Sequence, residues 1–401
     1  MAATTTATDL VAAPELESPE TLKSFYLLDP DITFLNHGSF GACPRPVFEE
    51  YQAWQLELER QPVHFIGRRQ EALLDAARAR IGTYLNADPD SLSFVVNATS
   101  GLNVIARSIE LKPGDEVLTT NLEYGALDMT WDYLCKKSGA TYVVQEIPVP
   151  FTTPQAVVDA LWEGVNEHTR AIFLSHITSA TATILPVAEI CARARKEGIL
   201  TIIDGAHAPG QIDLDMEALG CDIYSGNFHK WLQSPKGSAF LYVRPEHHDW
   251  IESLTISWGW VRGNSFVSRN QQQGTRDVAA FLSVPAAIDF QEQHNWPAVR
   301  ARAHQMLAMT RARMHEKLGT TPLYGGSADD DTTWYNQLGL ITLPKLEDRG
   351  AFQNRLLNHY GIEIPVSGHN DDWYFVRVSV QGYVTQKDLD TLESALIAEL
   401  S

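Results

Sequence analysis

Residues 200–232 read LTIIDGAHAPGQIDLDMEALGCDIYSGNFHKWL and hold two apolar runs, each followed by a chemically capable side chain. The run Leu200–Ile203 predicts a buried strand, and Asp204 follows directly at its carboxyl end. The run Cys221–Tyr224 predicts a second strand, and Lys230 follows in GNFHKWL. An open α/β sheet binds its ligands beyond the carboxyl ends of its strands. The sequence therefore predicts a site at one sheet edge that contains both residues.

The same alternation of strand and helix extends outward from this stretch over the middle of the chain. Such a pattern is typical of βαβ units, so we expect an α/β fold with a mostly parallel, seven-stranded sheet. The seven strand candidates are Leu92–Val96, Glu116–Thr119, Tyr142–Gln145, Ala171–Ser175, Leu200–Ile203, Cys221–Tyr224 and Ala239–Val243. The helix candidates between them are Gly101–Glu110, Tyr124–Lys137, Pro154–Glu163 and Val187–Gly198.

The two ends of the chain predict three further parts. Residues 1–20 lack periodicity and predict a disordered tail, and 21–62 an N-terminal arm with a helix near Val47–Arg60. Residues 63–276 form the predicted large domain and 277–401 a smaller α+β domain. The smaller domain is predicted from helical residues Ala279–Lys317, strands near Leu338–Leu343 and Trp373–Val380, and a helix after Thr385.

Composition excludes several classes of protein. The 401 residues carry a formal net charge of 31 − 50 = −19, so no basic surplus exists to displace counterions from nucleic acid. No apolar run reaches the length of a membrane span, and the first 20 residues do not predict a secretory signal. The four cysteines, Cys43, Cys135, Cys191 and Cys221, show no zinc or disulfide spacing. We expect reduced thiols, no metal site and a cytoplasmic location.

Lys230 and Asp204 are the residues whose surroundings point to chemistry. Phe, His and Trp flank Lys230, so its amine is expected to be desolvated, which lowers the pKa and suits Schiff-base chemistry. A carboxylate at the position of Asp204 can pair with a protonated pyridine nitrogen. The structural alternatives are a surface lysine in a chance aromatic cluster and a helix-capping aspartate.

The segment FVVNATSGLN, residues 94–103, adds a third part of the pattern. A predicted strand runs into Asn97, Ala98, Thr99, Ser100 and Gly101, where a helix begins. The amide groups of such a helix start bind anions, and the glycine spacing is not that of a nucleotide site. A plain capped helix is the alternative.

Together these features resemble the class V aminotransferase group of pyridoxal-phosphate (PLP) enzymes, which has the aspartate-aminotransferase fold (fold type I). The 26-residue interval from Asp204 to Lys230, the D-x-x-H motif ending at His207, and His229 before the lysine are similar to that group. The segments NHGSFGACPRP, FIGRRQ and GNFHKWLQSPKG resemble its isopenicillin N epimerase-like branch. The resemblance runs from about Thr33 to the C-terminus.

The resemblance implies a role for each matching residue. It implies that Lys230 forms the Schiff base with PLP and moves the proton at Cα, and that Asp204 binds the pyridine nitrogen. It places His207 and Ser179 near the ring hydroxyl and Tyr124 on the ring. The phosphate would be held by Asn97, Ala98, Thr99, Asn227 and His229.

On the substrate side, the resemblance implies that Arg377 binds the α-carboxylate, with Asn36, His37 and Arg68 nearby. Gly274 and Thr275 match a segment that reaches the phosphate of a neighbouring subunit, which implies a homodimer with shared sites. The structural alternatives are core histidines at His207 and His229, simple packing of Tyr124, pairing of Arg377 with a surface carboxylate, and a loop anchor at His37.

The branch implies epimerisation of an amino-acid moiety. The alternatives are C–S β-lyase chemistry, as in hercynylcysteine sulfoxide lyases, transamination, and a non-catalytic protein with this fold. Cysteine desulfurase chemistry is predicted to be absent, because all four cysteines precede residue 222 and SGHNDDWYFVRVS (367–379) has no thiol.

Overall fold

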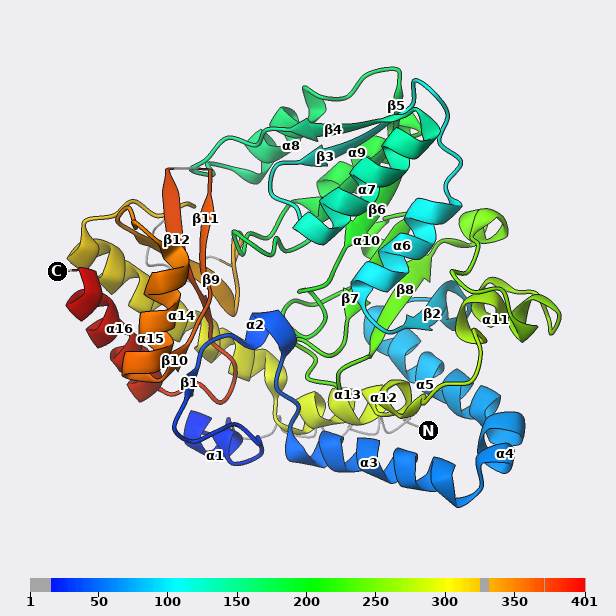
Figure 1. The fold of residues 1–401 in the computed structure, drawn as a ribbon, viewed down its shortest axis with the longest axis horizontal. Helices are drawn as coiled ribbons and strands as arrows, with labels where there is room; N and C mark the ends of the chain where they lie inside the picture. Colours follow the sequence, from blue (N-terminus) through cyan, green and yellow to red (C-terminus); the bar gives the residue numbers. More distant parts are fainter. Residues whose placement is uncertain (1–15, 325–331, 371, 401) are drawn as a thin grey trace, which may run out of the picture.

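The protein is described from a computed structural model that covers residues 16–324, 332–370 and 372–400. A seven-stranded sheet with helices on both faces forms one part, and a smaller three-stranded sheet with its own helices lies beside it (Figure 1). The predicted α/β fold class is therefore confirmed.

The large sheet has the strand order β2-β8-β7-β6-β5-β3-β4. Its strands are β2 (Leu92–Val95), β3 (Glu116–Thr120), β4 (Thr141–Gln145), β5 (Thr169–Ser175), β6 (Leu200–Asp204), β7 (Ile223–Asn227) and β8 (Ala239–Val243). Strand β8 pairs antiparallel with both of its neighbours, and the pairs from β7 to β4 are parallel. The sheet is mostly parallel, as the sequence predicts.

Helices cover both faces of this sheet because its central strands are apolar on both sides. In β6, Ile202 packs in a cluster with Trp131 of α7 (Gly125–Ser138), while Ile203 packs in the opposite cluster with Ile190 of α9 (Val187–Glu197). Both isoleucines have 0% exposure. The two layers hold β6 rigidly and fix where Asp204 emerges.

The small sheet is antiparallel in the order β11-β12-β9. Its strands are β9 (Leu338–Leu343), β11 (Val366–His369) and β12 (Trp373–Ser379), with α14 (Trp296–Leu318), α15 (Arg349–Tyr360) and α16 (Gln386–Leu400). Strand β1 (Thr33–Phe34) pairs in parallel with β10 (Ile362–Glu363) in a separate two-stranded sheet, so the N-terminal arm reaches the smaller part of the molecule. Figure 1 shows α2 (His37–Phe40) between the two parts.

The remaining elements complete the chain. They are α1 (Pro19–Lys23), α3 (Arg45–Arg60), α4 (Pro62–His64), the π-helix η1 (Phe65–Arg69), α5 (Gln70–Leu85), η2 (Pro89–Ser91), α6 (Ala98–Ser108), α8 (Pro154–Trp162), α10 (Met216–Leu219), η3 (Pro245–Trp250), η4 (Trp258–Trp260), α11 (Phe266–Gln271), α12 (Ala279–Leu282) and α13 (Val284–Gln293). The domain limits stay predictions, and residues 1–15 of the predicted tail lie outside the described residues.

One local difference from the predicted elements affects the site. The strand expected at Cys221–Tyr224 is observed as β7, at Ile223–Asn227. Glycine and asparagine generally favour turns, yet Gly226 and Asn227 pair with Phe240 and Ala239 of β8 and are buried. Tertiary pairing overrides their local preference, and it places Asn227 at the end of the strand.

Candidate active site

A cavity of about 460 Å³ opens at the carboxyl ends of β5, β6 and β7, against residues of the small sheet. Most of the predicted site residues line it. They are Asn97, Ala98, Thr99, Tyr124, Ser179, Asp204, His207, Asn227, His229, Lys230 and Arg377. Residues that are up to 280 positions apart in the chain, from Asn97 to Arg377, therefore meet at one edge of the sheet, as the sequence predicts.

Lys230 lies partly exposed in this cavity, three residues after β7 ends. Its Nζ lies 3.0 Å from Nε2 of His207. Burial and the positive charge of Arg377 lower the pKa of Lys230 from 10.5 to about 7, and Asp204 acts in the opposite direction. The amine is therefore available in its nucleophilic, uncharged form near neutral pH.

Asp204 is the last residue of β6 and is 4% exposed. Among the described residues, its Oδ1 accepts one hydrogen bond, from the Ala206 N–H at 2.9 Å. Burial raises its pKa from 3.8 to about 6, against the lowering effects of that bond and of Lys230. A buried carboxylate with so few donors favours a cationic N–H partner in the cavity. The next residue is Gly205, where a Cβ would lie 1.9 Å from the Tyr224 ring.

The N-terminus of α6 borders the cavity and is built as an anion site. The Asn97 side chain caps it by accepting the Ser100 N–H at 2.7 Å, and Asn227 Oδ1 accepts the Ala98 N–H at 2.8 Å. Asn227 thus links β7 to the start of α6. The positive end of the helix dipole and the Thr99 hydroxyl suit a phosphate group.

His229 lines the same side of the cavity and has one ring nitrogen committed. Its Nδ1 lies 2.9 Å from the carbonyl oxygen of Ser238, so Nδ1 carries a proton and donates it. Burial lowers the pKa of His229 to about 4. The ring is therefore neutral, with Nε2 unprotonated, at neutral pH.

Arg377 comes from β12 of the small sheet and is 7% exposed. Its Nη1 donates to the Ser179 carbonyl at 2.5 Å, and its Nη2 donates to Ser39 Oγ at 2.9 Å. Its Nε is buried without a hydrogen-bond partner in the described part of the chain. A guanidinium that is held at both ends and still has an unmatched donor suits a carboxylate ligand.

The segment 36–41, which contains the short helix α2, contacts the backbone of Lys230. His37 is fully buried, with Nε2 3.0 Å from the Lys230 carbonyl oxygen and Nδ1 3.0 Å from the Tyr383 hydroxyl. Gly41 has φ +68°, and a Cβ there would lie 2.2 Å from the His229 carbonyl oxygen. Only glycine permits this conformation and approach together.

Four predicted residues are not among those that line the cavity. His37 anchors the loop, and Asn36 donates from Nδ2 to Glu363 at 2.8 Å. Arg68 is exposed in the π-helix η1, and Thr275 is exposed in a separate hollow that includes Ile66. In the described part of one chain, Arg68 and Thr275 therefore lie away from the cofactor-side residues.

Two cavity features were missed in the sequence. Ser175 ends β5 and lines the cavity, and both its N–H and its hydroxyl donate to Glu123 Oε2, at 2.7 and 2.6 Å. Thr120 donates to the other oxygen of Glu123 at 2.6 Å. Burial raises the pKa of Glu123 to about 8, although these bonds lower it. The available signal was a carboxylate four residues after a predicted strand, Glu116–Thr119, and beside Tyr124.

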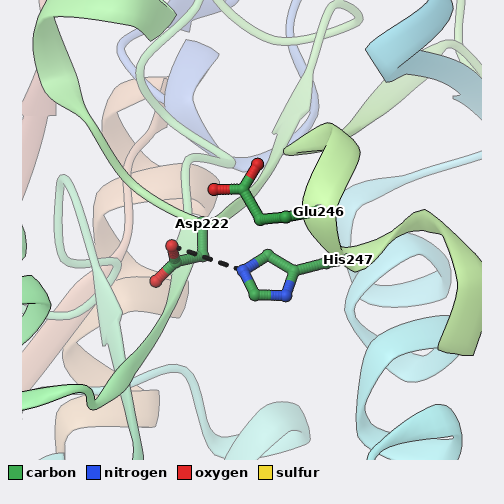
Figure 2. A group of neighbouring side chains, drawn as sticks. All are labelled: Asp222, Glu246 and His247. Atoms are coloured by element: carbon green, nitrogen blue, oxygen red, sulfur yellow. Dashed lines mark ion pairs between the residues drawn. The ribbon is translucent and has the colours of Figure 1, made fainter.

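A second charged cluster lies at the opposite, amino-terminal edge of the sheet (Figure 2). Asp222, Glu246 and His247 are a group in the described residues whose ligand atoms all lie within 4.8 Å. Arg244 sits among them, with Nε 3.1 Å from Glu246, and Thr201 occupies Asp222 Oδ2 with two hydrogen bonds. The cluster is an ion-pair network in which Arg244 pairs with both Asp222 and Glu246.

The cofactor-side residues fit PLP by their chemistry. An uncharged amine suits the aldehyde, the poorly solvated Asp204 suits a pyridinium N–H, and the α6 N-terminus suits the phosphate. The class defined by this fold and site is that of fold type I PLP enzymes. The chain belongs to the aminotransferase class-V family, whose model matches residues 43–392.

Within that family, the chain is similar to isopenicillin N epimerases. It is 34% identical to that of Amycolatopsis lactamdurans, covering 92% of this chain and 95% of the relative, and 31% identical to that of Streptomyces clavuligerus, covering 94% and 98%. It is 23% identical to a hercynylcysteine sulfoxide lyase of Schizosaccharomyces pombe over 75% of this chain and 79% of the relative. The predicted branch resemblance is confirmed.

Solved structures show the same fold. A lysine-to-alanine mutant of C-DES with glycine covalently linked to the PLP cofactor matches with a TM-score of 0.80 at 20% identity, covering 93% of this chain and 97% of that one. A cysteine desulfurase from Thermococcus onnurineus matches with a TM-score of 0.80 at 18% identity, covering 96% and 99%. The family and the PLP-bound neighbour together indicate PLP as the cofactor. Among the described residues, no helix combines the length and apolar character needed to span a membrane.

Proposed function

We propose that this protein is a PLP-dependent epimerase that inverts the configuration at Cα of an amino-acid moiety with an extended side chain. The observation that carries the proposal is similarity to two isopenicillin N epimerases at 31–34% identity over more than 90% of the chain. The cavity supports it, because it combines an uncharged lysine amine with a carboxylate-binding arginine.

The cavity residues have distinct proposed tasks. When bound, PLP supplies an electron sink for the negative charge that develops at Cα. Asp204 holds the pyridine N–H, and the α6 N-terminus, Thr99 and His229 hold the phosphate. Arg377 binds the substrate carboxylate and thereby orients the Cα–H bond. Lys230 removes the proton from Cα on its side.

Inversion requires a second proton donor on the other face of Cα. Tyr124 is the cavity-lining phenol, it is 44% exposed, and it precedes the first residue of α7. We propose Tyr124 for this task. Tyr124→Phe is expected to slow inversion at least about a hundredfold while solvent-hydrogen exchange with retention, which needs only Lys230, persists. Equal loss of inversion and of exchange would show that another residue is the proton donor on the second face.

The second candidate is C–S β-lyase chemistry on a cysteine conjugate or sulfoxide, favoured by the similarity to hercynylcysteine sulfoxide lyase. Desulfurase chemistry at a protein thiol is not proposed. Cys135, Cys191 and Cys221 are buried, Cys43 is partly buried, and none is among the cavity-lining residues. Burial raises the pKa of Cys43 to about 12, which opposes formation of a thiolate.

We also propose that the protein acts as a homodimer whose partner supplies Thr275 to the site, and that it acts in the cytoplasm. Val63, Ile256, Trp258 and Val261 are each at least 63% exposed, and large apolar side chains left open to solvent favour a protein interface. Light scattering on the purified protein is expected to give twice the monomer mass. A monomer with full activity would contradict shared sites.

The cofactor proposal is tested by spectroscopy. The purified protein is expected to be yellow, and borohydride is expected to bleach it and to fix the cofactor mass on the peptide that contains Lys230. Lys230→Ala is expected to lack both signals. A colourless preparation that does not take up added PLP would contradict the proposal and favour the non-catalytic alternative.

The reaction is tested by incubation with amino acids and cysteine conjugates in heavy water. Cα deuteration with inversion is the expected result. Pyruvate, ammonia and a released sulfur product would instead support the lyase, and a keto acid formed only with an amino acceptor would support a transaminase.

A further inference from the structure

The two ring nitrogens of His207 face two different partners. Its Nδ1 lies 3.4 Å from Nε1 of Trp231, and its Nε2 lies 3.0 Å from Nζ of Lys230. Both His207 and Trp231 are buried, at 2% and 0% exposure. The three side chains form a short chain of contacts that ends at the lysine amine.

The indole determines the direction of this chain. The Nε1 of tryptophan is a donor only, so Nδ1 of His207 has to be the acceptor. Burial lowers the pKa of His207 well below its ordinary value, so the ring is neutral and its proton is on Nε2. That N–H points at Lys230, and it can donate only to an amine with a free lone pair.

We propose that Trp231 is a positioning residue that fixes the Nε2–H tautomer of His207, so that His207 donates a hydrogen bond to the Lys230 amine and holds it as the free base. The inference rests on the proposed role of Lys230 as the amine that captures the cofactor aldehyde. Burial and Arg377 already favour the free base of Lys230, and the hydrogen bond donated by His207 adds to that preference.

Trp231 is held in place for this task by contacts on several sides. Its ring lies 5.1 Å from the His37 ring between centroids, and its carbonyl oxygen accepts the Gln291 Nε2–H at 2.9 Å. Gln211 donates to the His207 carbonyl oxygen at 2.9 Å, which fixes the histidine backbone. These contacts pack the Trp231 ring against His37 and fix the backbones of Trp231 and His207.

The charged groups around the amine act in both directions. Asp204 from β6 favours the ammonium form, whereas Arg377 from β12 favours the free base. His207 and His229 are neutral near pH 7 and add no full charge. Because the two full charges oppose each other, a single donated hydrogen bond has a measurable effect on the protonation of Lys230.

The first test reads the tautomer directly in the full chain after removal of bound cofactor. Nitrogen-15 spectra of the histidine side chains are expected to show Nε2 protonated and Nδ1 unprotonated in His207, with His207→Gln identifying the signals. A proton on Nδ1, or on both nitrogens, near pH 7 overturns the proposal.

The second test measures the free-amine fraction of Lys230 by competitive labelling with fluorodinitrobenzene and mass spectrometry across pH 5–10. Trp231→Phe keeps the ring and removes the donor, and labelling at pH 7 is expected to fall about fivefold, as for loss of one hydrogen bond. The matched control is Trp131→Phe, because Trp131 is also fully buried and its Nε1 lacks a partner in the described structure. Equal profiles for the two variants overturn the proposal.

A third comparison keeps the test valid if Trp231→Phe perturbs packing. A glutamine amide carries its N–H without any tautomer, so Trp231→Phe is expected to have no further effect on labelling in His207→Gln. A further fall there would show that packing, not the tautomer, is responsible, and would overturn the proposal. All three readouts use cofactor-free protein, so a failure here is separate from a failure to bind PLP.

Discussion

Asp204 ends one strand and Asp222 precedes the neighbouring strand, so the two lie at opposite edges of one sheet, and their surroundings differ. Asp204 ends β6 and accepts a single described hydrogen bond, from Ala206. Asp222 immediately precedes β7 and accepts two from Thr201, with His247 at 3.5 Å and Arg244 at 3.9 Å. Burial raises the pKa of Asp204 to about 6. Burial acts in the same direction on Asp222, but hydrogen bonds from His247 and Thr201 outweigh it and lower its pKa.

The comparison shows that unpaired polar groups, and not the volume of the hollow, identify the ligand-binding site. The amino-edge hollow that contains Asp222 measures about 970 Å³, against about 460 Å³ for the cavity that contains Asp204. In the larger hollow, Asp222 already pairs with His247 (Figure 2), and Arg244 pairs with Asp222 and Glu246. In the smaller cavity, the carboxylate of Asp204 and the Nε of Arg377 lack partners that a ligand can provide.

The largest expected contrast between the edges is in activity. Lys230→Ala removes the amine and is expected to lower turnover at least about a thousandfold, with loss of the visible absorbance of bound cofactor. Asp222→Asn changes a charge in the larger hollow and is expected to leave turnover within about twofold. Turnover and absorbance measured on both variants check this. A comparable loss in Asp222→Asn would give the amino edge a part in catalysis.

The two edges should also differ in how anion binding depends on pH. His229 already donates from Nδ1, so a dianion at its Nε2 requires uptake of a proton. Its pKa is about 4 without ligand and rises when a dianion binds, so sulfate affinity is expected to fall about tenfold per pH unit between pH 4 and the pKa of the bound state. Calorimetry of sulfate binding in two buffers of different ionisation enthalpy should show about one proton taken up.

The control for this linkage is the histidine at the other edge. His247→Gln is expected to keep the proton uptake, and His229→Gln is expected to abolish it. Sulfate binding without proton uptake in the unaltered protein would show that His229 is not the anion ligand.

Stability should respond with opposite signs at the two aspartates. The folded pKa of Asp204 is raised from 3.8 to about 6, so its contribution is present below pH 4 and is lost as pH rises through 6. Asp204→Asn is therefore expected to stabilise the cofactor-free protein by about 1–2 kcal/mol at pH 8. The folded pKa of Asp222 is lowered, so its contribution is present above pH 4, and Asp222→Asn is expected to cost about 1 kcal/mol.

Urea unfolding at pH 8 and pH 4.5 measures both effects. The Asp204→Asn gain is expected to shrink at pH 4.5, where the native carboxyl is largely protonated. If Asp222→Asn stabilised the protein, or Asp204→Asn destabilised it, the predicted difference in sign between the two aspartates would be wrong.

The parts of the site that follow strand ends could be predicted from sequence. Asp204, Asn97 and Lys230 each come shortly after an apolar run, and parallel strands bring such positions to one edge. The resemblance supplied Arg377 from the other sheet, since no local pattern links it to β6. Arg68 and Thr275 lie away from the cavity of their own chain. A sequence does not reveal whether the same residues of a second chain would reach this cavity.

The hydrogen-bond partners inside the site could not be predicted in this way. The contact of Trp231 with His207 depends on the path of residues 205–211 and 228–233, which no periodicity determines. The contact of Ser175 with Glu123 depends on the register of β5 with its neighbours. Side-chain pairs across loops follow from packing of the whole domain, so they become visible only in three dimensions.

The smallest expected effect concerns how Arg377 is held. Ser39 accepts from Arg377 Nη2 at 2.9 Å and donates to Asn36 Oδ1 at 2.5 Å, which ties the guanidinium to the loop 36–41. Ser39→Ala leaves Ser179 as the remaining anchor. The KM for the amino-acid substrate is expected to rise about threefold to fivefold with kcat nearly unchanged. The reason is that Arg377 binds the carboxylate equally in the ground state and the transition state, and both interactions weaken together.

Ser108→Ala is the matched control, since Ser108 donates to two carbonyl oxygens at the amino-edge hollow, those of Val104 and Glu252. It removes a hydroxyl of the same kind and is expected to leave KM unchanged. If both variants raised KM alike, general loosening of the fold would explain the effect. A rise confined to Ser39→Ala would locate substrate binding at the carboxyl edge, where unmatched donors and acceptors remain for a ligand.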